Sequence, residues 1–179
     1  MQDFPSALEL AKLNYENYKN NPYHIQAYFS CLIKSDEQNK NEILKELIES
    51  MSLIKNKVSE EMTARLQAQY FAFIDEDYDN AIDYIDRAIS INPDIQYARF
   101  IKFDIAEKFG KIDMMKSIIR QFETSDLKSK YHNNYVYMNS LLISKIKNAD
   151  EAKSYFCKNI SNYTELAKER FLNRLDNNK

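Results

Sequence analysis

The chain has 179 residues, of which one is Gly, three are Pro, two are Cys and two are His. Phosphate-binding loops, the nucleophile turn of serine hydrolases and tight β-hairpins need glycine at positions where no other side chain fits, and only Gly110 is available. Strand-rich domains also use Gly and Pro at many turns. The composition therefore predicts an all-α protein and disfavours an active site built from loops.

The charge is nearly balanced over the whole chain and unbalanced between its halves. The net charge of −2 gives no global field that would attract nucleic acid or an anionic membrane. Residues 1–92 carry nine Lys/Arg against 16 Asp/Glu, whereas residues 93–179 carry 16 against 11. From this split of −7 and +5 we expect self-association through the oppositely charged halves, head to tail or antiparallel, weakened by salt.

The sequence also indicates a compartment. Two isolated cysteines, Cys31 and Cys157, do not make a disulfide framework, which favours a reducing environment. The chain does not open with a charged segment followed by an apolar one, and no apolar run approaches the roughly 20 residues of a membrane span. We expect a cytoplasmic protein that does not bind membranes.

The first predicted element is a helix over residues 5–21. Ala7, Ala11, Tyr15 and Tyr18 fall on one helical face, and Pro22 is expected to end the helix. The segment has the pattern of the second helix of a hairpin whose first helix is missing. This raised the hypothesis that the chain is part of a longer protein.

The clearest helical pattern lies between Asp77 and Pro93. Ala81, Ile85 and Ala88 are spaced four and three residues apart and share one face, Asp79 can cap the start, and Pro93 stops the helix. This segment resembles the second helix of a tetratricopeptide repeat, a helix-turn-helix unit of about 34 residues. The three-position pattern recurs, with first members 37, 34 and 37 residues apart, at Leu44/Ile48/Met51, Ala81/Ile85/Ala88, Met115/Ile119/Phe122 and Ala152/Phe156/Asn159.

The resemblance implies one tetratricopeptide-like domain over residues 1–179. It would be a right-handed α-solenoid of antiparallel helical hairpins with about ten helices. Gly110 is expected in one of the turns as a left-handed residue after the first helix of its hairpin. The expected elements are a leading helix at 5–21, hairpins at 23–57, 61–94, 95–129 and 132–161, and a capping helix at 163–176.

The same resemblance implies a binding surface. First helices of such hairpins line a concave groove, and Tyr and Phe, which make up 13% of this chain, are typical of binding surfaces. The carboxylate-clamping mode of the family is not supported, because its Asn positions hold Tyr70, Asp104 and Leu141 here, so an apolar or mixed-charge peptide fits better. The predicted groove residues are Phe29, Ile33, Tyr70, Phe73, Tyr97, Phe100, Asp104, Tyr137 and Leu141.

Metal and catalytic chemistry are not expected. Acidic residues between Asp75 and Asp86 match a calcium-loop spacing, but Asn80 stands where that loop needs glycine, and a helix start explains the same residues. The two Cys and two His lack the close-spaced pairs of zinc sites, and nothing beside them would activate a nucleophile. We therefore predict no enzyme activity, no metal and no cofactor.

Three functions stay open at this point. The first is a non-catalytic scaffold that binds a protein or peptide partner in the aromatic-rich groove. The second is a regulatory or sensor portion of a larger bacterial enzyme or signalling protein. The third is RNA binding by the basic C-terminal half, although no base-stacking motif accompanies the basic cluster of Lys102, Lys108, Lys111, Lys116, Arg120, Lys128 and Lys130.

Overall fold

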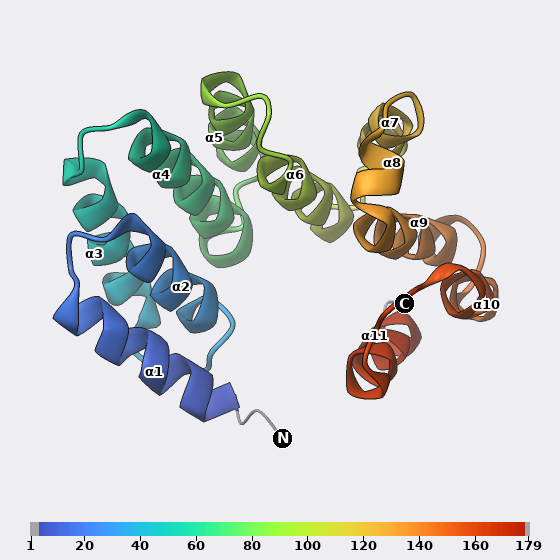
Figure 1. Cartoon of the computed structure of the whole chain (residues 1–179), viewed down its shortest axis with the longest axis horizontal. Coiled ribbons are helices and arrows are strands. Elements are labelled where there is room, and N and C mark those ends of the chain that lie inside the picture. Colours follow the sequence, from blue (N-terminus) through green and yellow to red (C-terminus); the bar gives the residue numbers. More distant parts are fainter. Residues whose placement is uncertain (1–3, 178–179) are drawn as a thin grey trace. The chain divides into compact units, whose positions relative to one another are not determined.

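The computed structural model describes residues 4–177, and within that range the fold is all-α, as predicted. Eleven α-helices and one π-helical segment follow one another in this part of the chain and pack mostly as pairs of sequence neighbours (Figure 1). A helix long and apolar enough to cross a membrane is not found among the described residues.

The chain divides into two compact units, Met1–Ile105 (unit 1) and Ala106–Lys179 (unit 2). Within unit 1 each helix packs against the next from α1 to α5, and α2 also contacts α4. Its elements are α1 (Phe4–Asn17), α2 (Pro22–Leu32), α3 (Lys40–Leu53), α4 (Lys57–Tyr70), the π-helical segment η1 (Phe71–Asp75), α5 (Tyr78–Ile91) and the larger part of α6 (Tyr97–Lys108).

The leading helix is present but ends earlier than expected. It stops at Asn17, four residues before the predicted end, so Pro22 does not terminate it. Pro22 instead opens α2, where its fixed backbone suits the first turn and its missing N–H costs nothing. The Asn21 side chain caps that helix by accepting a hydrogen bond from the Tyr23 backbone N–H at 3.0 Å.

Positions of the predicted three-residue pattern are mostly buried. Ala81, Ile85 and Ala88 are fully buried on α5, where α5 contacts α4. Small residues at the contact let two helices approach closely, and α4 and η1 match them with buried Ala64, Ala68 and Ala72. Among the remaining pattern positions only Ile48 and Asn159 are half-buried, and the buried ones are Leu44, Met51, Met115, Ile119, Phe122, Ala152 and Phe156.

The predicted turn between α4 and α5 has an unusual geometry. After η1, Glu76 adopts a left-handed conformation with φ of 55°, and the Asp77 backbone N–H reaches back to the Phe71 carbonyl at 2.9 Å. Asp77, and not the expected Asp79, is the N-cap of α5, and its carboxylate accepts a hydrogen bond from the Asn80 backbone N–H at 3.1 Å. The shift by two residues follows from the left-handed residue, which reverses the chain before Asp77.

A buried ion pair interrupts the apolar surface of α4. The Arg65 Nε donates to Glu61 Oε1 at 2.5 Å, and the two side chains are 3% and 0% exposed. Glu61 Oε2 and Arg65 Nη1 have no hydrogen-bond partner, while the Arg65 guanidinium lies over the Tyr97 ring, 4.9 Å from its centroid. The free-energy cost of removing two charges from water exceeds the stabilisation from their mutual attraction when the pair is only partly hydrogen-bonded. This pair is therefore not expected to add net stability.

Unit 2 contains the last three residues of α6, Ala106 to Lys108, and all later helices. They are α7 (Ile112–Glu123), α8 (Leu127–Lys130), α9 (His132–Ile146), α10 (Ala149–Asn159) and α11 (Glu165–Asn177). Helix α9 packs against α7, α8 and α10, and α10 packs against α11. The four-residue α8 was not predicted from the sequence.

Gly110 has the predicted place in the turn after α6. Its φ of +65° is the left-handed conformation that ends a helix, and the following Lys111 N–H bonds the Ala106 carbonyl at 2.8 Å. A Cβ built on Gly110 would meet no atom within 4 Å. The glycine is therefore favoured by its backbone conformation and not by a lack of space.

The buried pair leads to a first prediction. In Arg65→Ala the Glu61 carboxylate stays buried without its partner, so the free energy of unfolding should fall by about 3–5 kcal/mol. The double variant Glu61→Leu/Arg65→Met replaces both charges with apolar groups of similar volume and should be neutral or up to about 4 kcal/mol more stable than wild type. Urea unfolding measures the free energy of unfolding of the single and the double variant, with Arg87→Ala as a control that removes an exposed arginine. A double variant as unstable as Arg65→Ala would contradict the prediction.

A second prediction concerns the cap of α5. Hydrogen bonds from the Asn80 side chain and backbone lower the pKa of Asp77 below its ordinary value of 3.8. The cap therefore stabilises the fold above that ordinary value, and its contribution disappears as the pH falls through the lowered pKa. At pH 7 we expect Asp77→Ala to lower Tm by about 2–4 °C.

The matched control for the cap is Asp79→Ala, which removes an exposed carboxylate from the same first turn. Thermal unfolding followed by circular dichroism should show a smaller decrease for this variant. The Tm gap between Asp77→Ala and wild type should also narrow in acid. Equal effects of the two variants, or a gap that persists in acid, would assign the cap to another group.

Candidate functional site

The nine predicted groove residues occupy different environments. In unit 1, Phe29 and Tyr70 are 0% and 5% exposed and belong to the hydrophobic core of α1 to α4, with Ile33 packed against it. Phe73 and Tyr97 are 37% and 43% exposed. Phe100 and Asp104 are half-buried. Unit 1 therefore offers Phe73 and Tyr97 as the aromatic surface of this set, while Phe29 and Tyr70 contribute to packing.

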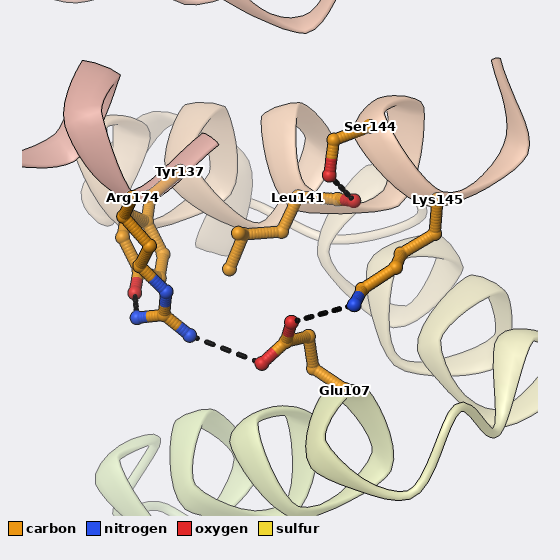
Figure 2. A network of polar contacts seen from close by, with 6 residues as sticks. All are labelled: Glu107, Tyr137, Leu141, Ser144, Lys145 and Arg174. Atoms are coloured by element: carbon orange, nitrogen blue, oxygen red, sulfur yellow. Dashed lines mark hydrogen bonds and ion pairs between the residues drawn. The ribbon is translucent and has the colours of Figure 1, made fainter. Parts of the chain in front are cut away.

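In unit 2 the two predicted residues lie on α9 at the edge of a polar cluster. Leu141 is fully buried and Tyr137 is half-buried. Figure 2 shows Leu141 pointing toward the space between Arg174 and Lys145, with the Glu107 carboxylate facing both cations. We call Glu107, Tyr137, Lys145 and Arg174 the Arg174 cluster.

Glu107 is the centre of the Arg174 cluster. It lies in the last turn of α6, and its side chain is only 9% exposed. Oε1 lies 3.3 Å from the Lys145 ammonium of α9, and Oε2 accepts a hydrogen bond from Arg174 Nη2 of α11 at 3.0 Å. One buried carboxylate thus holds cationic side chains from two other helices, which is the arrangement that a buried charge requires.

Arg174 is positioned by a second contact. Its Nη1 donates a hydrogen bond to the Tyr137 hydroxyl, and its guanidinium lies 5.4 Å from the centroid of the same ring (Figure 2). The Tyr137 ring is itself fixed by Phe171, whose centroid lies 4.6 Å away. The guanidinium is therefore held by a carboxylate and an aromatic ring while 42% of the Arg174 side chain remains exposed.

The two cations of the cluster are more exposed than its carboxylate. The Arg174 cluster as defined contains two cationic side chains, Lys145 and Arg174, and one carboxylate, Glu107. Lys145 and Arg174 keep 25% and 42% of their side-chain surface exposed, whereas the carboxylate is almost covered. The parts of the cluster that reach solvent are therefore mainly the cationic side chains.

The sequence pattern predicts only one member of this cluster. Tyr137 was predicted from its groove position, but Glu107, Lys145 and Arg174 were not predicted as site residues. Arg174 and Glu107 lie 67 residues apart in sequence. No local spacing could join residues from three helices, and a lone Arg on the polar side of a terminal helix looks like ordinary solvated surface.

A second polar group lies where α7, α8 and α9 meet. The Tyr135 hydroxyl donates to Glu123 Oε1 at 2.8 Å, and Lys128 lies over the same ring at 4.7 Å. Burial raises the pKa of Tyr135, with the hydrogen bond to Glu123 acting in the same direction. The phenol therefore stays protonated and acts as a hydrogen-bond donor between helices, not as an acid or base.

The basic residues considered for RNA binding are largely engaged with neighbours. Lys102 pairs with Asp86 at 2.5 Å in unit 1. In unit 2, Lys116 pairs with Asp113 at 3.6 Å, and Lys128 and Lys130 lie over the tyrosine rings at 135 and 131. These contacts distribute the positive charge among helix surfaces.

The acidic segment of the calcium-loop spacing is also accounted for by the fold. Asp77 caps α5 and Asp86 pairs with Lys102. Among the described residues, groups of three or more side chains that could hold a metal ion are not found. Both cysteines are free thiols, Cys31 half-buried and Cys157 exposed.

Comparisons with protein-family models, curated proteins and solved structures give no match to this chain. The assignment of a binding surface therefore depends on the residues and their geometry alone.

Proposed function

We propose that this chain is a non-catalytic protein-interaction module and that the Arg174 cluster binds an acidic segment of a protein partner. The observation that carries the proposal is an exposed arginine whose guanidinium is already held by Glu107 and Tyr137. Arg and Tyr are the side chains that most often dominate binding energy at interfaces. A guanidinium fixed before binding loses less conformational entropy when a partner carboxylate docks.

The proposed ligand chemistry follows from the charge of the face. A peptide carboxylate would approach Arg174 and Lys145 and find Tyr137 beside them for apolar contact. Arginine binds carboxylates through two parallel hydrogen bonds, which lysine cannot do. An acidic residue flanked by apolar ones is therefore the expected core of the ligand, which agrees with the mixed-charge peptide expected from the sequence.

The resemblance of the Asp77–Pro93 segment to a tetratricopeptide helix supports the same proposal. The proposal includes the arrangement of the helices: a right-handed α-solenoid whose first helices line a concave groove. Repeats of that kind serve mainly as binding surfaces. A fold of this type does not by itself determine a function. The regulatory and RNA-binding alternatives remain hypotheses, and no specific contact favours either.

A peptide-binding experiment tests the proposal. A random peptide library selected against the wild-type chain should enrich peptides that contain Asp or Glu next to apolar residues. For an enriched peptide, Arg174→Ala should raise Kd by about tenfold or more, and Arg174→Lys should give an intermediate loss because the bidentate contact is gone. Isothermal titration calorimetry measures both.

The matched control is Arg170→Ala, which removes an exposed arginine from the same helix. Its Kd and Tm should equal those of wild type. Arg174→Ala removes one of the two cationic partners of buried Glu107, so its Tm should fall, and circular dichroism checks that it is folded at the temperature of the titration. Selected peptides without acidic residues, or equal losses for the variants at 170 and 174, would reject the Arg174 cluster as the binding site.

A further inference from the structure

A hollow of about 350 Å³ lies in unit 1, where the end of α3 and the loop after it meet α4 and α5. Binding sites for small molecules begin at roughly 300 Å³. Lys55 of the loop and Arg87 of α5 line this hollow. Its α4 side is one helical face at positions i, i+3, i+4 and i+7, which consists of Glu60, Thr63, Ala64 and Gln67.

The three charged side chains of the lining do not neutralise one another. Lys55 and Arg87 are cations and Glu60 is a carboxylate, and all three are exposed. Among the described residues no ion pair joins them, and neither Glu60 nor Arg87 forms a side-chain hydrogen bond. Asp83, one turn before Arg87 on α5, does not pair with it either. Each charge therefore keeps hydrogen-bonding capacity for solvent or a ligand.

The other polar contacts of the lining also leave capacity over. Lys55 Nζ donates to the Ser52 carbonyl at 3.0 Å, which leaves two of its three N–H groups for other acceptors. The Thr63 hydroxyl donates to the Ser59 carbonyl at 2.7 Å, so its oxygen can still accept a hydrogen bond. The Gln67 side-chain amide has no hydrogen bond with any described residue and can both donate and accept. The hollow thus has spare donors and spare acceptors.

The two signs of charge in the lining select the ligand. Arginine binds a carboxylate through two parallel N–H groups, and a glutamate carboxylate binds an ammonium group. An inorganic anion would satisfy Arg87 and Lys55 but would be repelled by Glu60, whereas an apolar molecule would remove all three charges from water without partners. A ligand with both a carboxylate and an ammonium group leaves neither sign unpaired. Ile54 and the buried Ala64 add a small apolar surface.

We propose that the hollow of Lys55, Glu60, Gln67 and Arg87 binds a free α-amino acid. Arg87 and Lys55 hold its carboxylate, and Glu60 holds its ammonium group. An α-amino acid carries both groups on one carbon atom and is small enough for a hollow of about 350 Å³. The ligand has few atoms and the exposed side chains lose rotamer freedom on binding, so we expect a Kd of about 0.1–10 mM. This proposal does not depend on peptide binding by the Arg174 cluster.

Titration followed by nuclear magnetic resonance tests the proposal, with each standard free amino acid added separately to the isotope-labelled chain. At least one of them should shift the amide signals of residues 52–67 and of Arg87 in a saturable manner. Two analogues of the best ligand then separate its charged groups. The α-amide lacks the carboxylate and the N-acetyl derivative lacks the ammonium group, and each should bind about tenfold more weakly than the parent amino acid.

Substitutions identify which side chain meets which group. Arg87→Ala should weaken binding of the parent amino acid about tenfold and leave binding of the α-amide unchanged, because the lost contact is the one to the carboxylate. Glu60→Gln should weaken binding of the parent and leave binding of the N-acetyl derivative unchanged for the corresponding reason.

The matched controls are Arg170→Ala and Glu42→Gln, which remove exposed charges that do not line the hollow. Both should bind the amino acid with the wild-type Kd. All four substituted positions are exposed, so each variant should keep the wild-type Tm.

Several results would overturn the proposal. They are the lack of a saturable shift with every amino acid up to about 50 mM, shifts confined to other parts of the chain, and a wild-type Kd for both Arg87→Ala and Glu60→Gln. Inorganic phosphate is the competitor that distinguishes a general anion site. Phosphate should displace the amino acid poorly, and displacement at equal concentration would show that Glu60 does not select an ammonium group.

Discussion

Most helices in the described part of this protein bury apolar side chains against helices that are next to them in sequence, and the rest of the structure depends on this local burial. The contact between α4 and α5 is the clearest case, because both helices carry buried alanines, Ala64 and Ala68 on α4 and Ala81 and Ala88 on α5. Small side chains bring the helix backbones close together, and larger ones beside them fill the remaining space. Contacts between sequence neighbours therefore account for much of the burial in this part of the chain.

This mode of packing determines where polar groups can be buried. On α4, Glu61 and Arg65 form a buried pair whose hydrogen-bonding capacity is only partly used, and the Arg65 guanidinium lies over the Tyr97 ring. In unit 2, Glu107 has two cationic partners and leaves one of them, Arg174, substantially exposed. Burial of the first pair costs stability, whereas the second arrangement leaves an arginine partly exposed beside a tyrosine ring, and the proposed binding function rests on this observation.

Much of the fold could be predicted from the sequence because its signals are local. The spacing of Ala81, Ile85 and Ala88 predicts a buried face, and all three are fully buried. The lone glycine was expected in a turn, and Gly110 has the left-handed backbone of one. The predicted position of the end of the leading helix was wrong. A proline can follow the end of one helix or occupy the first turn of the next, and Pro22 does the second.

The candidate site could be predicted only in small part. A helix that contacts neighbours on two sides carries aromatic residues on each, so periodicity does not separate a groove residue from a core residue. Phe29 and Tyr70 are in the core for this reason, while Tyr97 remains exposed. The Arg174 cluster depends on three helices meeting, and a contact across 67 residues leaves no local spacing to recognise.

The most direct test of local burial is native-state hydrogen exchange of the dilute chain, resolved by helix. Because α4 has packed neighbours on several sides and α1 has few, we expect the slowest exchange in α4 and α5 and faster exchange in α1 and α11. Protection that decreases from the α4–α5 contact outward through unit 1 would support packing between neighbours. Uniform protection along the chain, or amides of α1 and α11 that exchange as slowly as those of α5, would contradict it.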